Sequence, residues 1–67
     1  MRLELAQYRE KIRLSQSQIA LNLGFTKSYY AKIEEGTRNP GFEFVLSFAK
    51  TYPDADIRYL FFNTKIH

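Results

Sequence analysis

The sequence contains no cysteine and no tryptophan, and its one histidine, His67, is the last residue. Without cysteine the chain has neither a disulfide framework nor a thiolate metal site, and a single terminal histidine cannot form a zinc site alone. No apolar run approaches the ~20 residues of a membrane-spanning helix, and no basic stretch with an apolar block follows Met1 as in a signal peptide. We therefore expect no metal or other cofactor, no membrane partner and a cytoplasmic location.

The chain is short, and its 67 residues provide one domain at most, because a chain of this size buries only about 60% of its unfolded surface. Its 45% hydrophobic content includes six Phe and five Tyr, which suffices for a small core and argues against disorder. We expect one domain over residues 1–62 and a tail over 63–67. From Met1 and this tail we expect a whole protein, with an excised domain as the alternative, and we expect neither a ligand-sensing domain nor a small-molecule ligand.

Positive charge is concentrated in the first half of the chain. The net charge is +3, and residues 1–38 carry seven Lys and Arg against four acids, whereas residues 39–67 carry three of each. The basic half predicts a surface that faces a polyanion. An ordinary solvated surface is the alternative that charge alone leaves open.

Hydrophobic spacing and a helix cap predict two helices near the amino terminus. Apolar residues recur every three or four positions over 2–13, the pattern of an amphipathic helix. Ser15 and Gln18 have the spacing of a capping box at the start of a second helix. This helix extends over 16–23 and stops at Gly24, the residue type that most readily adopts a left-handed conformation.

A third helix is predicted over 27–35. Thr26 is placed to cap its first turn, and Gly36 ends it. Tyr30 and Ile33 face inward in this interpretation, and the opposite face is polar and basic.

Turn residues and prolines divide the second half. Residues 37–41 contain Asn-Pro-Gly, which favours a loop. A fourth helix follows from residue 42 and is terminated by Pro53, and Asp56 is placed to cap a short fifth helix over 57–62. The apolar stripe of the fourth helix consists of Phe42, Val45, Leu46, Phe48, Ala49 and Tyr52.

The helices predicted over 16–23 and 27–35 are joined only by Gly24, Phe25 and Thr26. A three-residue connection that contains glycine is typical of a helix-turn-helix. The basic outer face of the second helix in this pair is therefore the main candidate for a functional surface.

An ordered set of landmarks extends along the chain: Leu14-Ser15-Gln16, Ile19-Ala20, Leu23-Gly24, Thr26, Ile33-Glu34, Gly36, Asn39-Pro40 and Ala49. In this order and spacing, the chain resembles the Cro and phage-repressor (Xre-like) helix-turn-helix DNA-binding family over about residues 3–62. It departs from the family at Tyr30, where a β-branched aliphatic residue is usual, and at Phe44, where a polar residue is common. The resemblance implies an all-α, compact, five-helix lambda-repressor-like domain with its helix-turn-helix at the second and third helices.

The resemblance implies a sequence-specific regulator of transcription that binds double-stranded DNA. A small Cro-like repressor from a phage or mobile element, acting in the bacterial nucleoid or the infected cell by occupying an operator, fits best. Lys27, Ser28 and Lys32 match the base-reading positions of the third helix, which enters the major groove in this family. Because lysine donates to guanine O6 and N7, these residues favour a guanine-containing half-site.

Contacts to the DNA backbone are implied at five further residues. Gln16 matches a phosphate-contacting position at the amino-terminal, positive end of its helix. Thr37, Arg38 and Asn39 in the following loop position the domain on phosphate without reading sequence. Tyr29 reaches the backbone through its hydroxyl, with a ring lying flat on the helix surface as the alternative.

The resemblance also implies an ion pair between Arg9 and Glu34, which match a structural pair between the first and third helices of relatives. Removing one member of a buried pair costs ~3 to 5 kcal/mol because the other charge is left alone.

The carboxyl-terminal half has more aromatic residues than a small core needs. Phe44, Tyr59, Phe62 and Ile66 are candidates for a self-complementary homodimer interface, with filling of the core as the alternative. A two-fold dimer, formed at least on DNA, would place two third helices about 34 Å apart on a palindromic operator.

Enzymatic activity is not expected. Ser15 and Ser17 have no histidine near them in sequence, and no glycine-rich phosphate loop is present. Two other functions are considered: an antitoxin that masks a toxin with its aromatic carboxyl-terminal half, and a purely protein-binding module. Salt dependence of DNA affinity separates the regulator from the protein-binding module, and a stable partner protein would favour the antitoxin.

Overall fold

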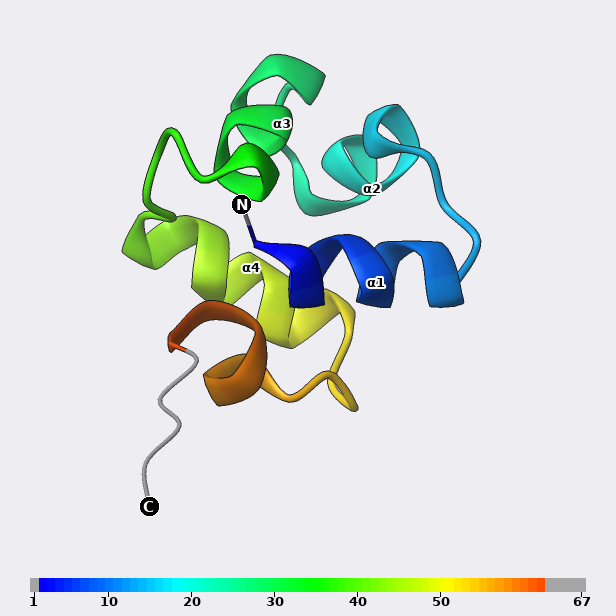
Figure 1. Cartoon of the computed structure of the whole chain (residues 1–67). Coiled ribbons are helices and arrows are strands. Elements are labelled where there is room, and N and C mark those ends of the chain that lie inside the picture. The colour runs from blue at the N-terminus through cyan, green and yellow to red at the C-terminus, as the bar shows by residue number, and fades with distance from the viewer. Residues whose placement is uncertain (1, 63–67) are drawn as a thin grey trace.

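A computed structural model describes residues 2–62, and Figure 1 shows that its regular elements are all helical. The order is α1 (Leu3–Lys11), α2 (Gln16–Leu23), α3 (Lys27–Glu35), α4 (Phe42–Thr51) and η1 (Arg58–Phe62). The predicted all-α, five-helix fold is thus confirmed, and residues 2–62 contain no strand. The predicted tail, with Ile66 and His67, lies outside these residues. None of the described helices has the length and apolar character needed to cross a membrane.

Helix α1 is shorter than the predicted 2–13. Arg13 has a φ of 62°, in the left-handed region, so the helix does not continue through it. The backbone N–H of Leu14 donates to the Arg9 carbonyl at 3.2 Å, and the Arg9 Nη1 donates back to the Leu14 carbonyl at 2.9 Å. These two contacts turn the chain sharply toward α2.

The caps predicted for α2 and α3 are confirmed. The Ser15 Oγ accepts from the Gln18 N–H at 3.1 Å, and the Gln18 Oε1 accepts from the Ser15 N–H at 2.7 Å, which is a complete capping box. Gly24 ends α2 with a φ of 85°. The Thr26 Oγ1 accepts from the Tyr29 N–H at 3.1 Å at the start of α3. The boundaries of both helices therefore follow from local chemistry.

Helix α4 buries only part of the predicted stripe, and it also buries Phe44, which lies outside that stripe. Phe44 and Phe48 are completely buried, whereas Phe42 is 78% exposed and Leu46 is 42% exposed. Phe44 lies with its ring centroid 5.3 Å from that of Phe25, and the edge-to-face geometry of this pair is favourable. Contacts with the helix-turn-helix thus set the rotation of α4 about its own axis. The spacing of apolar residues in the sequence does not predict this rotation.

The fifth element, η1, begins one residue later than predicted and is a π-helical turn rather than an α-helix. The Asp56 Oδ1 accepts from the Tyr59 N–H at 3.2 Å, so Asp56 caps this turn as expected. Leu60 and Phe61 are both buried. Over five residues, hydrophobic spacing does not distinguish a π-turn from an α-turn.

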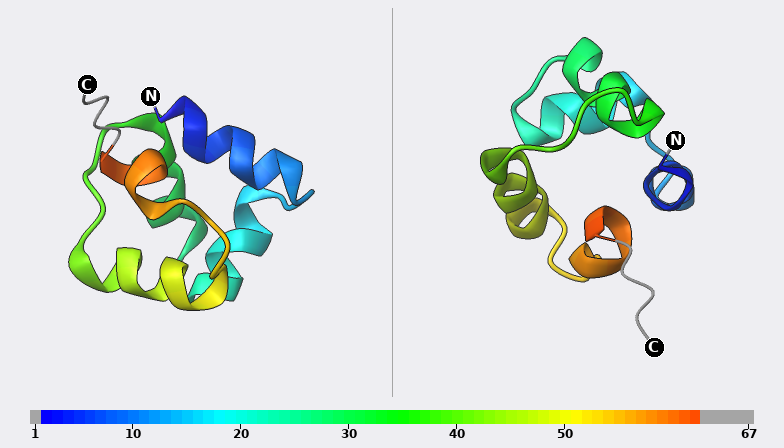
Figure 2. Two further views of the ribbon diagram at one scale, coloured as in Figure 1. Left: turned by 90° about the horizontal axis from the view of Figure 1, so that it is seen from below. Right: turned by 60° about the vertical axis from the view of Figure 1, so that its left-hand side comes forward.

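The core lies between the helix-turn-helix and the pair formed by α4 and η1. Helix α2 contacts α3 and α4, while α1 contacts α3 and η1. Figure 2 shows η1 beside α1, and its right-hand view shows α3 and η1 at opposite ends of the molecule. The core consists of Leu5, Ile19, Ala20, Leu23, Tyr30, Ile33, Phe44, Phe48, Leu60 and Phe61. One face of α3 is therefore used for packing, and its opposite face is left on the surface.

Candidate nucleic-acid interface

The turn between α2 and α3 is fixed by its backbone. The N–H of Phe25 donates to the Ala20 carbonyl at 2.9 Å, and Gly24 takes the left-handed conformation that reverses the chain. An ideal Cβ placed on Gly24 would meet nothing within 4 Å, so conformation and not space requires glycine here. The short turn fixes the angle at which α3 meets α2.

Helix α3 has a buried face and an exposed face. Tyr30 and Ile33 are completely buried, whereas Lys27, Ser28 and Lys32 are exposed. Ser28 and Lys32 are four positions apart and share a helix face, and Lys27 lies about 100° around the helix from Ser28, so the three side chains lie within one half of the circumference. The three predicted base-reading side chains therefore share one surface.

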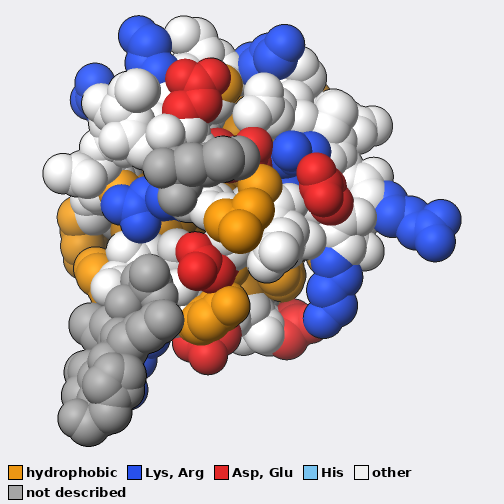
Figure 3. Space-filling view, viewed as in Figure 1, with side chains coloured by type: hydrophobic (Ala, Val, Ile, Leu, Met, Phe, Trp, Pro, Cys, Tyr) orange, Lys and Arg blue, Asp and Glu red, His pale blue; other side chains and the backbone are white. Residues whose placement is uncertain are grey.

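Positive charge is present at this end of the molecule. Figure 3 shows Lys and Arg side chains along the edge where α3 lies, with acidic side chains beside them, and further basic side chains on other parts of the same face. The space between Lys27 and Lys32 on the exposed face is occupied by Ser28 and the half-buried Ala31. Because Ser and Ala are short, the helix axis can approach a flat or grooved partner closely while the lysines extend past it.

The loop after α3 is folded back onto the helix end. Gly36 has a φ of 88°, and the Lys32 carbonyl accepts from the N–H groups of Thr37 and Arg38 at 3.0 and 3.2 Å. The Thr37 Oγ1 donates to the same carbonyl at 3.2 Å. Thr37, Arg38 and Asn39 are all exposed. The structure thus brings the three loop residues that we expected to contact phosphate to the same end of the molecule as α3.

Tyr29 is half-buried and its ring lies in a stack. Its ring is 5.0 Å from that of Phe25 at an interplanar angle of 19°, and the Arg38 guanidinium carbon lies over it, 4.9 Å from the centroid. The Tyr29 hydroxyl accepts from the Gly41 N–H at 3.4 Å. This hydroxyl therefore links α3 to the start of α4.

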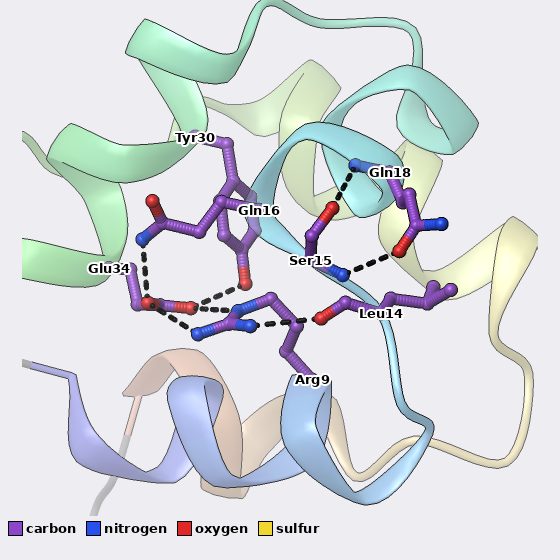
Figure 4. A network of polar contacts seen from close by, with 7 residues as sticks. All are labelled: Arg9, Leu14, Ser15, Gln16, Gln18, Tyr30 and Glu34. Atoms are coloured by element: carbon purple, nitrogen blue, oxygen red, sulfur yellow. Dashed lines mark hydrogen bonds and ion pairs between the residues drawn. The ribbon is translucent and has the colours of Figure 1, made fainter.

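Arg9 and Glu34 form an ion pair that connects α1 to α3 (Figure 4). The Arg9 Nε lies 2.9 Å from the Glu34 Oε2, and Nη2 lies 3.3 Å from Oε1. Two neutral donors complete the site: the Gln16 Nε2 at 2.8 Å from Oε1 and the Tyr30 hydroxyl at 2.9 Å from Oε2. A single buried carboxylate thus joins α1, α2 and α3.

The charge state of this network follows from its donors. Burial alone would raise the pKa of Glu34, but hydrogen bonds from Arg9, Gln16 and Tyr30 outweigh burial, and the pKa lies below its ordinary value. The hydrogen bond to Glu34 raises the pKa of Arg9. Burial, followed by the hydrogen bond to Glu34, raises the pKa of Tyr30. At neutral pH the network therefore holds a carboxylate, a guanidinium and a neutral phenol.

Two residues are placed differently from our predictions. Phe44 is wrong as a dimer-interface residue, because its side chain is completely buried and its ring contacts those of Phe48 and Phe61. Gln16 is half-buried and one N–H of its side-chain amide donates to Glu34, so its second N–H and its other polar groups are what it has for phosphate.

Tyr59 and Phe62 are 52% and 59% exposed, which leaves both available to a partner. Ile66, the fourth candidate for the dimer interface, lies outside the described residues.

Sequence reasoning missed the part of Tyr30 in the network and the stack around Tyr29. Tyr30 lies four residues before Glu34, a spacing that places both on one helix face and that could have indicated the hydrogen bond. No comparable signal marks Arg38 and Phe25, which come together around Tyr29 only in the folded chain. Among residues 2–62, no group of three or more His, Cys, Asp or Glu side chains is arranged to hold a metal ion.

Comparison with known proteins gives one family match. A model described as helix-turn-helix, of the Xre/Cro-like kind, matches residues 5–60. Searches of curated proteins and of solved structures found no match. The matched range contains α2, α3, the loop after them and the whole network around Glu34.

Proposed function

The chain belongs to the Xre/Cro-like helix-turn-helix family, whose members are DNA-binding regulators and not enzymes, and from this premise we propose that it is a small Cro-like repressor. In this proposal it binds a palindromic operator as a homodimer and blocks transcription by occupancy. The observation that carries the proposal is the exposed face of α3, on which Lys27, Ser28 and Lys32 stand together beside a basic loop.

Groove dimensions support α3 as the reading element. The major groove of B-DNA is about 12 Å wide and accepts one α-helix, and side chains on the amino-terminal turns reach the base edges. Lys27 and Ser28 lie on the first turn of α3, and Lys32 follows one turn later on the same face. Lysine donors favour guanine, and Ser28 donates or accepts according to the base it meets.

Phosphate contacts come from the flanking elements in this proposal. Thr37, Arg38 and Asn39 carry exposed donors on the loop after α3. Gln16 lies in the first turn of α2, where backbone N–H groups and the helix dipole favour an anion. These contacts set the orientation of the domain and contribute equally at every sequence.

Dimerisation in this proposal uses Tyr59 and Phe62 on η1, where both side chains are more than half exposed. A two-fold dimer on a palindromic operator would present two copies of α3 to successive major grooves, about 34 Å apart. The operator would then contain two half-sites related by inverted symmetry.

Selection of bound duplexes from a random pool tests this proposal. We expect a two-fold symmetric consensus, and the affinity for the selected duplex to fall linearly with salt on logarithmic axes. Replacing Lys27 and Lys32 together with Ala should weaken specific binding by at least about 1 kcal/mol, since a good base contact is worth about 1–3 kcal/mol.

A charge-matched control separates base contacts from net charge. Lys11 and Lys50 are exposed on α1 and α4, outside both α3 and η1. Replacing both with Ala removes the same two charges and should change the affinity by less than twofold at physiological salt. Equal losses from both double variants, or no enriched sequence, would overturn the proposal, and a stable partner protein without a salt-dependent DNA affinity would favour a protein-binding module.

A further inference from the structure

We propose that Tyr29 is a positioning residue, whose ring holds the Arg38 guanidinium beside the first turn of α3 so that Arg38 meets a DNA phosphate there. Tyr29 then acts through Arg38 and does not itself touch DNA. This inference rests on the proposed function, because it concerns how the same surface binds a duplex.

The first observation is the course of the loop. The Arg38 N–H donates to the Lys32 carbonyl at 3.2 Å, so the backbone of Arg38 is anchored in the second half of α3. Its guanidinium carbon nevertheless lies 4.9 Å from the centroid of the Tyr29 ring. Tyr29 precedes Lys32 by three residues, or about 4.5 Å along a helix axis. The side chain of Arg38 therefore carries its charge back toward the amino-terminal turn, where Lys27 and Ser28 stand.

The second observation is that the ring cannot move freely. Phe25 stacks on it at 5.0 Å, and Phe44 meets it edge-on at 5.7 Å and 66°. The Gly41 N–H donates to its hydroxyl at 3.4 Å. Because Phe44 is completely buried, the ring of Tyr29 is joined to the core and offers Arg38 a fixed platform.

The third observation is that the charge of Arg38 stays available. Within residues 2–62 the only ion pair is the one between Arg9 and Glu34, and the side chain of Arg38 makes no hydrogen bond in that range. A contact with an aromatic face uses none of the guanidinium N–H donors. Stacking therefore keeps the charge and its donors ready for an anion and lowers the entropy lost on binding.

The test is a double-mutant cycle measured with a fluorescent duplex of mixed sequence, because a phosphate contact weakens binding at all sequences alike. R38Q removes one phosphate contact, so the negative slope of log affinity against log salt should become shallower by about 0.9. If the two proteins bind equally at 1 M salt, this change corresponds to about an eightfold lower affinity of R38Q than of the wild type at 0.1 M salt. Tyr29→Leu removes the platform and should lower the affinity at least about threefold. Tyr29→Phe keeps the ring and should stay within about twofold of the wild type.

The decisive comparison is Tyr29→Leu in the R38Q background, where we expect no further loss of affinity. An equal loss in both backgrounds would overturn the inference, since the ring would then act on DNA or on the fold without Arg38. Thermal unfolding of each variant identifies any general loss of structure. If Tyr29→Leu does not fold, the chemical shifts of the Arg38 δ-protons are measured in the free wild type and in Tyr29→Phe instead. An upfield ring-current shift in both proteins supports the stack. The absence of this shift overturns the inference.

Failure of the proposed function gives a different result. A wild-type chain that binds neither the mixed-sequence duplex nor any selected duplex at low salt would overturn the proposed function, and the phosphate role of Arg38 with it. A wild-type chain that binds, with independent effects of the Tyr29 and Arg38 substitutions, would overturn the inference alone.

Discussion

Replacing Glu34 with Gln should lower the free energy of unfolding by about 3 kcal/mol. The substitution keeps the shape of the side chain but leaves the Arg9 guanidinium without its counter-charge, in a site where the two side chains are 15% and 5% exposed. Removing one member of a buried pair costs about 3–5 kcal/mol. We take the lower end of this range because the side chain of Arg9 keeps some contact with water.

Thermal unfolding followed by circular dichroism measures this loss, and urea unfolding gives it independently. For a domain of this size, about 1 kcal/mol shifts the melting temperature by about 4–8 °C, so we expect a decrease of about 12–24 °C. The whole domain is stabilised by only about 3–10 kcal/mol, so Glu34→Gln removes a large share of the total.

The pH dependence of this difference provides a further check. Because the pKa of Glu34 is lower in the folded chain than its ordinary value of 4.5, the unfolded chain binds the proton first as the pH falls. The stability from the ionised carboxylate is fully present above that ordinary value and is lost as the pH falls through the folded pKa. The difference between the wild type and Glu34→Gln should therefore be largest at neutral pH and shrink in acid.

Glu35 provides a matched control, since it is an exposed carboxylate on the same helix. Glu35→Gln should change the unfolding free energy by less than about 0.5 kcal/mol. Arg9→Met completes a double-mutant cycle, in which Glu34→Gln should cost much less once the guanidinium is gone. A loss below about 1 kcal/mol for Glu34→Gln, or the same loss in the Arg9→Met background, would refute this account of the ion pair.

Four further predictions concern local structure, packing and assembly. Gly24→Ala should lower the free energy of unfolding by about 1 kcal/mol, because alanine is strained in the left-handed conformation while open space surrounds the site. An unchanged midpoint of urea unfolding would contradict this. Ser15→Ala removes a capping box and should also cost about 1 kcal/mol, whereas a loss within error would show that Gln18 suffices. Phe44→Ala should cost about 3–5 kcal/mol because the ring is completely buried. Phe62→Ser should leave stability nearly unchanged and shift sedimentation toward the monomer, and an unaltered profile would remove Phe62 from the interface.

The helix-turn-helix could be predicted from the sequence because its ends depend on neighbours in the chain. Ser15 and Thr26 each cap a helix through an N–H three residues later, and Gly24 and Gly36 adopt the left-handed conformation that glycine favours. These interactions act within a few residues, so spacing alone indicates them. The exposed face of α3 followed from the same periodicity.

Features that depend on tertiary contacts could not be predicted in this way. The fourth helix has apolar side chains on several faces, and its rotation is decided by how Phe44 fits against Phe25 and Phe61. The sequence offers Tyr29 several partners, and only the folded loop selects Arg38. Arg13, which follows the end of α1, adopts a left-handed conformation that is uncommon for a residue with a side chain, and no local sequence pattern predicts it.

The central claim is that the lysine-bearing face of α3 lies against duplex DNA, and amide chemical-shift mapping with a selected duplex tests it most directly. We expect the largest changes at Lys27, Ser28 and Lys32 and in the loop over residues 37–39, with further changes on η1 where the dimer forms on DNA. Changes confined to α1 and η1, with the amides of α3 unaffected, would contradict it.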